Sequence, residues 1–114
     1  MKVNRKELFE MQADLCGVMS SAKRLMIMDH INRNKEANVG DLAEALDSSV
    51  STVSQHLRLM RNKNIVVSRK DGHTVFYRLK HPKMMEGCLA IKEVLLDEMR
   101  ISGEMADYIE DQVN

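Results

Sequence analysis

The sequence has no tryptophan, and only 4% of its 114 residues are aromatic. Ten methionines are present, and because methionine is flexible and polarizable it can fill irregular gaps in a core or form an adaptable interface. We favour core filling for most of them. Hydrophobic residues make up 44% of the chain, which excludes wholesale disorder and is enough to build one packed core.

Long apolar runs are also missing, and none approaches the length of about 20 residues that a membrane-spanning helix needs. The first ten residues alternate charges and lack the apolar centre of a signal peptide. We therefore expect a cytoplasmic protein with no membrane partner, whose thiols stay reduced. The two cysteines, Cys16 and Cys88, form neither a CxxC pair nor a four-ligand zinc set.

The motifs of common enzyme classes are absent as well. The sequence contains no nucleophile elbow, no glycine-rich phosphate loop and no HExxH pattern. A chain of this length leaves little room for a catalytic cleft beside its core. We therefore expect that the protein is not an enzyme and needs no cofactor or metal.

The net charge is zero, but the charges are unevenly distributed. Residues 84–114 carry two bases against eight acids, a net charge of −6. Residues 48–83 carry eight bases against Asp71 alone, a net charge of +7. A solvated surface is one explanation of this basic block, and a nucleic-acid footprint is the other.

Apolar spacing and capping residues predict four helices in the first half of the chain. The first covers residues 5–18, where apolar side chains recur every three or four positions. The second covers about 22–33 and is capped by Ser20 or Ser21, with a loop at 34–37. Two short helices follow, Val39–Leu46 after Asn38 and Val50 to about Lys63 after Ser49. Two short helices joined by a few polar residues are typical of a helix-turn-helix.

In the second half of the chain the spacing of apolar residues changes, and the new pattern predicts a β-hairpin followed by a long helix. Residues 65–69 and 74–79 are strand-like, and the Asp-Gly pair within 70–73 is a strong hairpin signal. Pro82 suits the first position of a helix over about 82–99, and 103–114 forms an acidic tail. We therefore predict an α+β fold, a winged helix-turn-helix in the order ααααββα, as one domain over residues 1–114.

The basic block coincides with the second helix of the motif and with the hairpin, the elements that meet DNA in a winged helix. Val53 and Leu57 are expected to face the core. Ser54, Gln55 and the first residues of the helix then face outward. Gln can pair with adenine edges, Ser is adaptable and Val can touch a thymine methyl group. The candidate DNA-binding residues are Ser49, Val50, Ser51, Thr52, Ser54, Gln55, His56, Arg58, Arg61, Arg69, Lys70 and His73.

Four segments in order resemble the ArsR/SmtB family of transcriptional repressors, and together they cover roughly residues 8–99. They are Ser21–Ile27, Val39–Ala43, Ser51–Leu57 with the following Asn64–Val66, and Arg69–Leu79. The resemblance implies a homodimer joined through its terminal helices, a palindromic operator, and repression that an effector relieves. The apolar faces of helices 5–18 and 82–99 independently suggest such a dimer, because they exceed what one small core needs.

The metal sites of the family do not match this chain. Where metal-sensing members carry a Cys-x-Cys-type site, this sequence has Asn38–Asp41 and no thiol. Zinc sites at the ends of the last helix would fall on His81, Lys83, Val94 and Asp97. Lys83 and Val94 are not ordinary zinc ligands, so we reject both sites.

Cys16 and Cys88 are the remaining candidates for sensing. Three roles stay open for them: buried packing residues, which we favour, a thiol switch, or a soft-metal or metalloid site. The sequence identifies neither the effector nor the regulated genes. The alternative function is a winged helix that binds other proteins and not DNA, against which the basic block argues.

Overall fold

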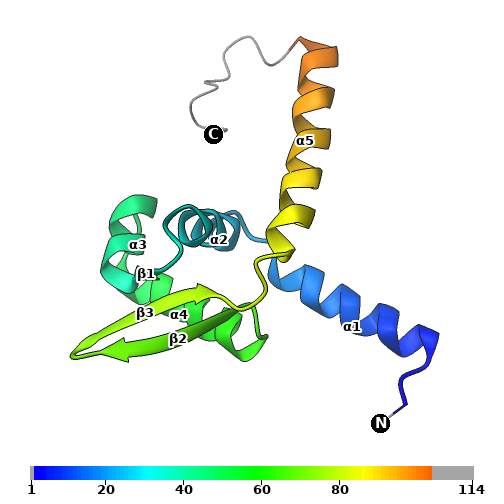
Figure 1. The fold of residues 1–114 in the computed structure, drawn as a ribbon. Helices are drawn as coiled ribbons and strands as arrows, with labels where there is room; N and C mark the ends of the chain where they lie inside the picture. Colours follow the sequence, from blue (N-terminus) through cyan, green and yellow to red (C-terminus); the bar gives the residue numbers. More distant parts are fainter. Residues whose placement is uncertain (1, 104–114) are drawn as a thin grey trace. The chain divides into compact units, whose positions relative to one another are not determined.

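The computed structural model describes residues 2–103, and its elements follow the order of a winged helix-turn-helix (Figure 1). The predicted fold class is confirmed, with one short strand added. The elements are α1 (Arg5–Val18), α2 (Ala22–Asn34), β1 (Ala37–Asn38), α3 (Val39–Leu46), α4 (Val50–Asn62), β2 (Val66–Asp71), β3 (Thr74–Leu79) and α5 (Met84–Ser102).

The chain divides into two compact units, Met1–Pro82 and Lys83–Asn114. The first unit holds α1 to α4 and the sheet, and the described part of the second is α5 with Gly103. The predicted acidic tail lies outside the described residues except for Gly103, and the prediction of one domain stays a prediction. The elements that could meet DNA all belong to the first unit.

Polar side chains start the helices where the sequence predicts. Ser21 accepts a hydrogen bond from the backbone N–H of Arg24, and Ser49 accepts one from Thr52. Asn38 does the same for Asp41, with an N···O distance of 2.8 Å. Each cap satisfies one of the N–H groups that the first turn of a helix leaves without a partner. These three caps explain why the starts of α2, α3 and α4 were predictable, and Asn4 caps α1 in the same way.

The core of the first unit is aliphatic and forms around the two helices of the motif. Leu42, Val53 and Leu57 are fully buried, as predicted, while Leu46 is only half-buried. Met28 and Met60 are also buried, so methionine does serve as core filler here. The other fully buried large side chains are Ile27, Ile31, Ile65 and Val66. α4 therefore has a fixed inward face, and its opposite face is left for solvent or a ligand.

The sheet has the order β1-β3-β2, with both pairs antiparallel. Strand β1 was predicted as loop, because two residues are too few to show a strand period. β2 was predicted to end at residue 69, but it continues to Asp71, and only Gly72 and His73 remain as the turn. Gly72 has φ 63°, the left-handed conformation that a II′ turn needs at its first central residue. We call residues 66–79 the wing.

The last helix begins two residues later than predicted. Lys83 is its N-cap, without a side-chain hydrogen bond, and Pro82 lies in the turn before it. Proline only fixes φ and suits a turn as well as a first helical position, so it could not locate the start. The helix also runs three residues beyond the predicted 99, to Ser102, and ends where Gly103 adopts φ 79°.

Candidate nucleic-acid interface

Helix α4 presents a polar face opposite its buried one. Val53, Leu57 and Met60 point into the core, and the candidate contact residues lie on the other sides of the helix. Val50, Ser51, Gln55, Arg58 and Arg61 are exposed, as is the cap Ser49, whereas Thr52, Ser54 and His56 are half-buried. The structure thus brings the predicted base-reading residues to one accessible surface at the start of α4. Their contacts with DNA stay predictions.

Two basic residues of α2 support the start of this helix. Lys23 Nζ donates a hydrogen bond of 2.8 Å to Ser48 Oγ, in the turn between α3 and α4. Arg24 donates through Nε to the carbonyl of Val18, and its Nη1 lies 3.4 Å from His56 Nδ1. Arg24 therefore connects the end of α1 with α4. Sequence reasoning missed both roles, because they depend on contacts between residues 25 and 32 positions apart.

The surroundings of His56 favour its neutral form. Burial is the main cause that lowers the pKa of His56, and the positive charges of Arg24 and then Lys23 act in the same direction. A neutral imidazole can accept the hydrogen bond from Arg24. His56 is one of the candidate DNA-binding residues, whereas in the structure its ring nitrogen lies beside this α2 arginine.

Acidification is expected to destabilise the protein through His56. The folded-state pKa lies below the unfolded value of about 6.5, so the unfolded chain binds more protons between these two values. The free energy of unfolding should fall as the pH falls through this window and should recover towards about pH 6.5. Urea denaturation at a series of pH values should show a shallower dependence for His56→Gln than for wild type. His73→Gln, at the exposed wing tip, is the control, and equal slopes for wild type and His56→Gln would contradict the expectation.

The wing tip and the start of α4 face each other across an open hollow of about 450 Å³. Val50 and Ser54 line one side of the hollow, and His73, Thr74 and Val75 line the other. Asn38, Val39 and Gly40, at the start of α3, complete the lining. Lys70 and His73 are exposed near the tip. The recognition surface therefore consists of a helix end and a separate basic hairpin.

Two of the eight bases in the basic block are paired with acids outside it. Lys63 Nζ lies 2.9 Å from Asp14 of α1, and Arg69 makes two hydrogen bonds to Glu36. Arg58, Arg61 and Lys70 take part in no ion pair with residues 2–103. The positive charge free to meet phosphate is thus smaller than the sequence total suggests. Arg58 and Arg61 lie on α4, and Lys70 lies at the wing tip.

No local pattern in the sequence singles out Glu36. It lies in a stretch that reads as loop, and its partner is 33 residues away. The hydrogen bond from Arg69 is the main cause that lowers the pKa of Glu36. Glu36 is therefore ionised at neutral pH and holds Arg69 on the outer surface of the sheet.

The cysteines and the metal-binding side chains form no cluster in the described part of the chain. Among residues 2–103, no group of three or more His, Cys, Asp or Glu side chains is placed to hold a metal ion. Cys16 is exposed on α1, and Cys88 is half-buried on α5 in the other unit. None of the helices in the same residues combines the length and the hydropathy needed to cross a bilayer.

Comparison with known proteins shows which class of protein this arrangement defines. Residues 21–68, which hold α2, β1, α3, α4 and the start of β2, match the arsR family of bacterial regulatory proteins. The nodulation protein NolR of Rhizobium meliloti is 32% identical over 89 residues, which are 78% of this chain and 72% of that protein. The chain belongs to the arsR family and is a transcriptional regulator.

Further similarities agree with this assignment. The crystal structure of NolR from Sinorhizobium fredii superposes with a TM-score of 0.71 and 31% identity, and the match covers 82% of this chain and 95% of that one. The cadmium resistance regulatory protein CadC of Listeria innocua is 35% identical over 68 residues, 60% of this chain. The match spans only 57% of the length of CadC, so its activity is not carried over.

Proposed function

We propose that this regulator binds double-stranded DNA in the cytoplasm as a homodimeric repressor. The observation that supports DNA binding is the exposed, polar and uncharged start of α4, with free basic residues further along the helix and on the wing tip. Such a helix fits the major groove, where Gln55 and Ser51 can read base edges. Lys70 and His73 of the wing would meet the neighbouring backbone. A winged helix that binds protein would not need this charge.

A gel-shift assay tests the proposal directly. The probe is the DNA upstream of the gene for this protein, and the competitor is random duplex of equal length at a fixed salt concentration. Specific retention of the upstream probe is expected, with non-specific binding that weakens steeply as salt rises. Equal retention of both duplexes would contradict a specific operator. No binding at any salt concentration would favour the protein-interaction module.

The dimer is proposed from unburied apolar side chains on both terminal helices. On α1, Leu8, Phe9 and Met11 are more than half exposed, and on α5 the same holds for Ile91, Val94 and Leu95. Apolar surface of this kind on a small domain marks an interface. A two-fold dimer would place two recognition helices about 34–36 Å apart, so the operator should be a palindrome.

Replacing Leu95 with glutamate is expected to separate the dimer without unfolding the protomer. Leu95 is 59% exposed, so the charge would be buried only when a second copy covers this face. Sedimentation equilibrium at micromolar concentration should show a monomer for Leu95→Glu and a dimer for wild type and for the control Glu93→Lys. A wild-type monomer, or a Leu95→Glu variant that stays dimeric, would argue against α5 as a dimerisation element.

Release from DNA is the last part of the proposal, and it involves an effector or modification of a thiol. Cys16 is exposed, so a solute can reach it, while Cys88 is half-buried. The gel-shift assay can be repeated after treatment with an oxidant or a persulfide donor, with Cys16→Ser and Cys88→Ser as controls. The expectation that both cysteines are buried packing residues does not hold for Cys16 in the structure. If wild type and both variants bind equally before and after treatment, neither cysteine senses the effector, which then acts elsewhere.

A further inference from the structure

The wing leaves the three-stranded sheet at one row of paired residues. In this row Asn38 of β1 pairs with Phe76 of β3, which pairs with Arg69 of β2. Beyond the row only β2 and β3 continue, for two more pairs, before the turn at Gly72. A two-stranded ribbon twists more freely than a wider sheet. Contacts at this row therefore decide in which direction the tip of the wing points.

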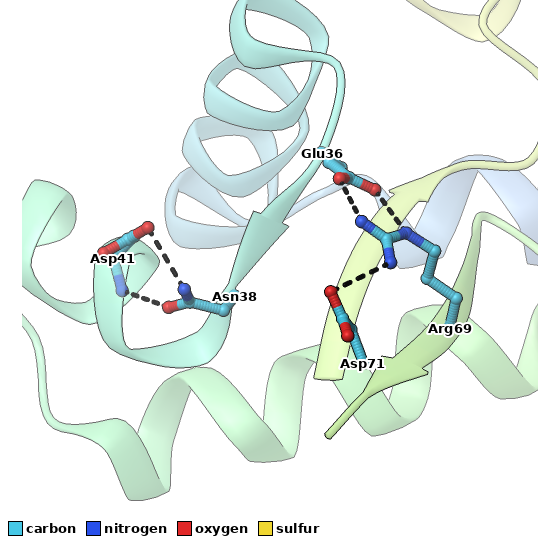
Figure 2. A network of polar contacts seen from close by, with 5 residues as sticks. All are labelled: Glu36, Asn38, Asp41, Arg69 and Asp71. Atoms are coloured by element: carbon cyan, nitrogen blue, oxygen red, sulfur yellow. Dashed lines mark hydrogen bonds and ion pairs between the residues drawn. The ribbon is translucent and has the colours of Figure 1, made fainter. Parts of the chain in front are cut away.

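Arg69 joins the two outer strands of the sheet across the middle one. Its Nε and Nη2 donate hydrogen bonds of 2.9 and 2.6 Å to the carboxylate of Glu36, the residue before β1 (Figure 2). Its guanidinium carbon lies 4.7 Å from the centre of the Phe76 ring on the strand between them. We call Glu36, Arg69 and Phe76 the wing brace.

The contact between Arg69 and Glu36 has the geometry of a strong ion pair. A guanidinium bound to both oxygens of one carboxylate is fixed in orientation, which a single contact would not achieve. Asp71 Oδ2 lies 3.9 Å from Nη1, on the side that faces away from Glu36 (Figure 2). The donors of Arg69 are therefore directed at acids of its own chain. A phosphate would have to displace Glu36 to gain the same two bonds.

Little else holds the tip of the wing. The open hollow of about 450 Å³ lies between His73 and Thr74 on one side and Val50 and Ser54 of α4 on the other. The buried residues of the wing, Val66 and Leu79, lie at its opposite end. The distance between the tip and α4 thus depends on the row that the brace fixes.

We propose that Glu36 and Arg69 are positioning residues, which hold the wing at the angle where Lys70 and His73 meet the DNA backbone, while Arg69 itself makes no phosphate contact. The inference rests on the proposed DNA binding. It replaces the sequence-based expectation that Arg69 contacts DNA. Glu36 is then needed for DNA binding although it is an acid.

Salt dependence and a double-mutant cycle test the proposal. Glu36→Gln and Arg69→Gln should each weaken binding to operator and random duplexes about threefold to tenfold, and the double variant should be no weaker than either single one. Neither should change the slope of log affinity against log salt concentration. Lys70→Gln should reduce that slope by about 0.9, as expected when one phosphate contact is lost. Fluorescence anisotropy at several salt concentrations measures all four variants.

Asp71→Asn is the matched control. It removes a negative charge nearer the tip and leaves the two hydrogen bonds to Glu36 in place, so it should not weaken binding. Thermal unfolding of each variant establishes that it is folded; an exposed ion pair contributes little to stability, so the variants should fold.

Three results would overturn the brace. A reduced salt slope for Arg69→Gln would make Arg69 a phosphate ligand. Tighter binding by Glu36→Gln would show that the acid merely withholds Arg69 from DNA. Wild-type affinity in both single variants would show that the wing needs no brace. Failure of the wild-type protein to bind any duplex is a different result, because it overturns the proposed function and the brace with it.

Discussion

Replacing Leu57 with alanine is expected to lower the free energy of unfolding by about 2–5 kcal/mol. Leu57 is fully buried on the inner face of α4, among other large aliphatic side chains such as Val53 and Met60. Alanine would remove apolar contacts and leave a cavity that the surrounding helices can only partly fill. Chemical denaturation monitored by circular dichroism would measure the loss.

Val50 provides the control on the same helix. It is also an aliphatic residue, but its side chain is 55% exposed, so Val50→Ala should change the free energy of unfolding by no more than about 0.5 kcal/mol. Similar losses in the two variants would mean that α4 does not have the inward face described above. The pair separates the structural side of the helix from the side proposed to meet DNA.

Replacing Gln55 with alanine should weaken operator binding by about 1–3 kcal/mol and leave binding to random DNA nearly unchanged. Gln55 is exposed near the start of α4, and its amide can both donate to and accept from one base edge. Ser54→Ala should show the same selectivity with a smaller loss, because Ser54 is half-buried at the edge of the hollow. Competition experiments with operator and random duplexes measure both.

Arg61→Gln is the comparison for this experiment. Arg61 is exposed in the last turn of α4, and an arginine there is suited to phosphate, so its loss should weaken binding to every sequence alike. Equal losses on operator and random DNA for Gln55→Ala would refute base reading by Gln55. Neither variant should alter stability, since both side chains are exposed.

Most of the fold was predictable because its signals are local. The caps Ser21, Asn38 and Ser49 start their helices where the sequence predicts, and Gly72 marks the hairpin turn. Strand β1 was missed because its two residues become a strand only by pairing with Tyr77 and Phe76 of β3. Its existence depends on tertiary contacts, which no local pattern reports.

The candidate site was predictable in part, for the same reason. The outward position of Gln55 follows from helical periodicity, once Val53 and Leu57 are assigned to the core. The partners of Arg69 and His56 do not follow, because Glu36 and Arg24 are 33 and 32 positions away. Counting charges along the chain therefore overestimated how much positive charge is free. Arg69 is paired with an acid, whereas the neighbouring Lys70 forms no ion pair with residues 2–103.

The outer half of the wing carries no fully buried side chain. Its buried residues, Val66 and Leu79, pair with each other at the end nearest the core, whereas Lys70 to Thr74 are exposed. Mutations at the tip therefore leave the hydrophobic core intact and change stability little. Natural variation can then adjust the length and charge of the tip, and with them the affinity for the DNA backbone, while the protein keeps its fold. Changes at the wing tip can therefore alter how fast the protein leaves its operator, while the base sequence that α4 reads stays the same.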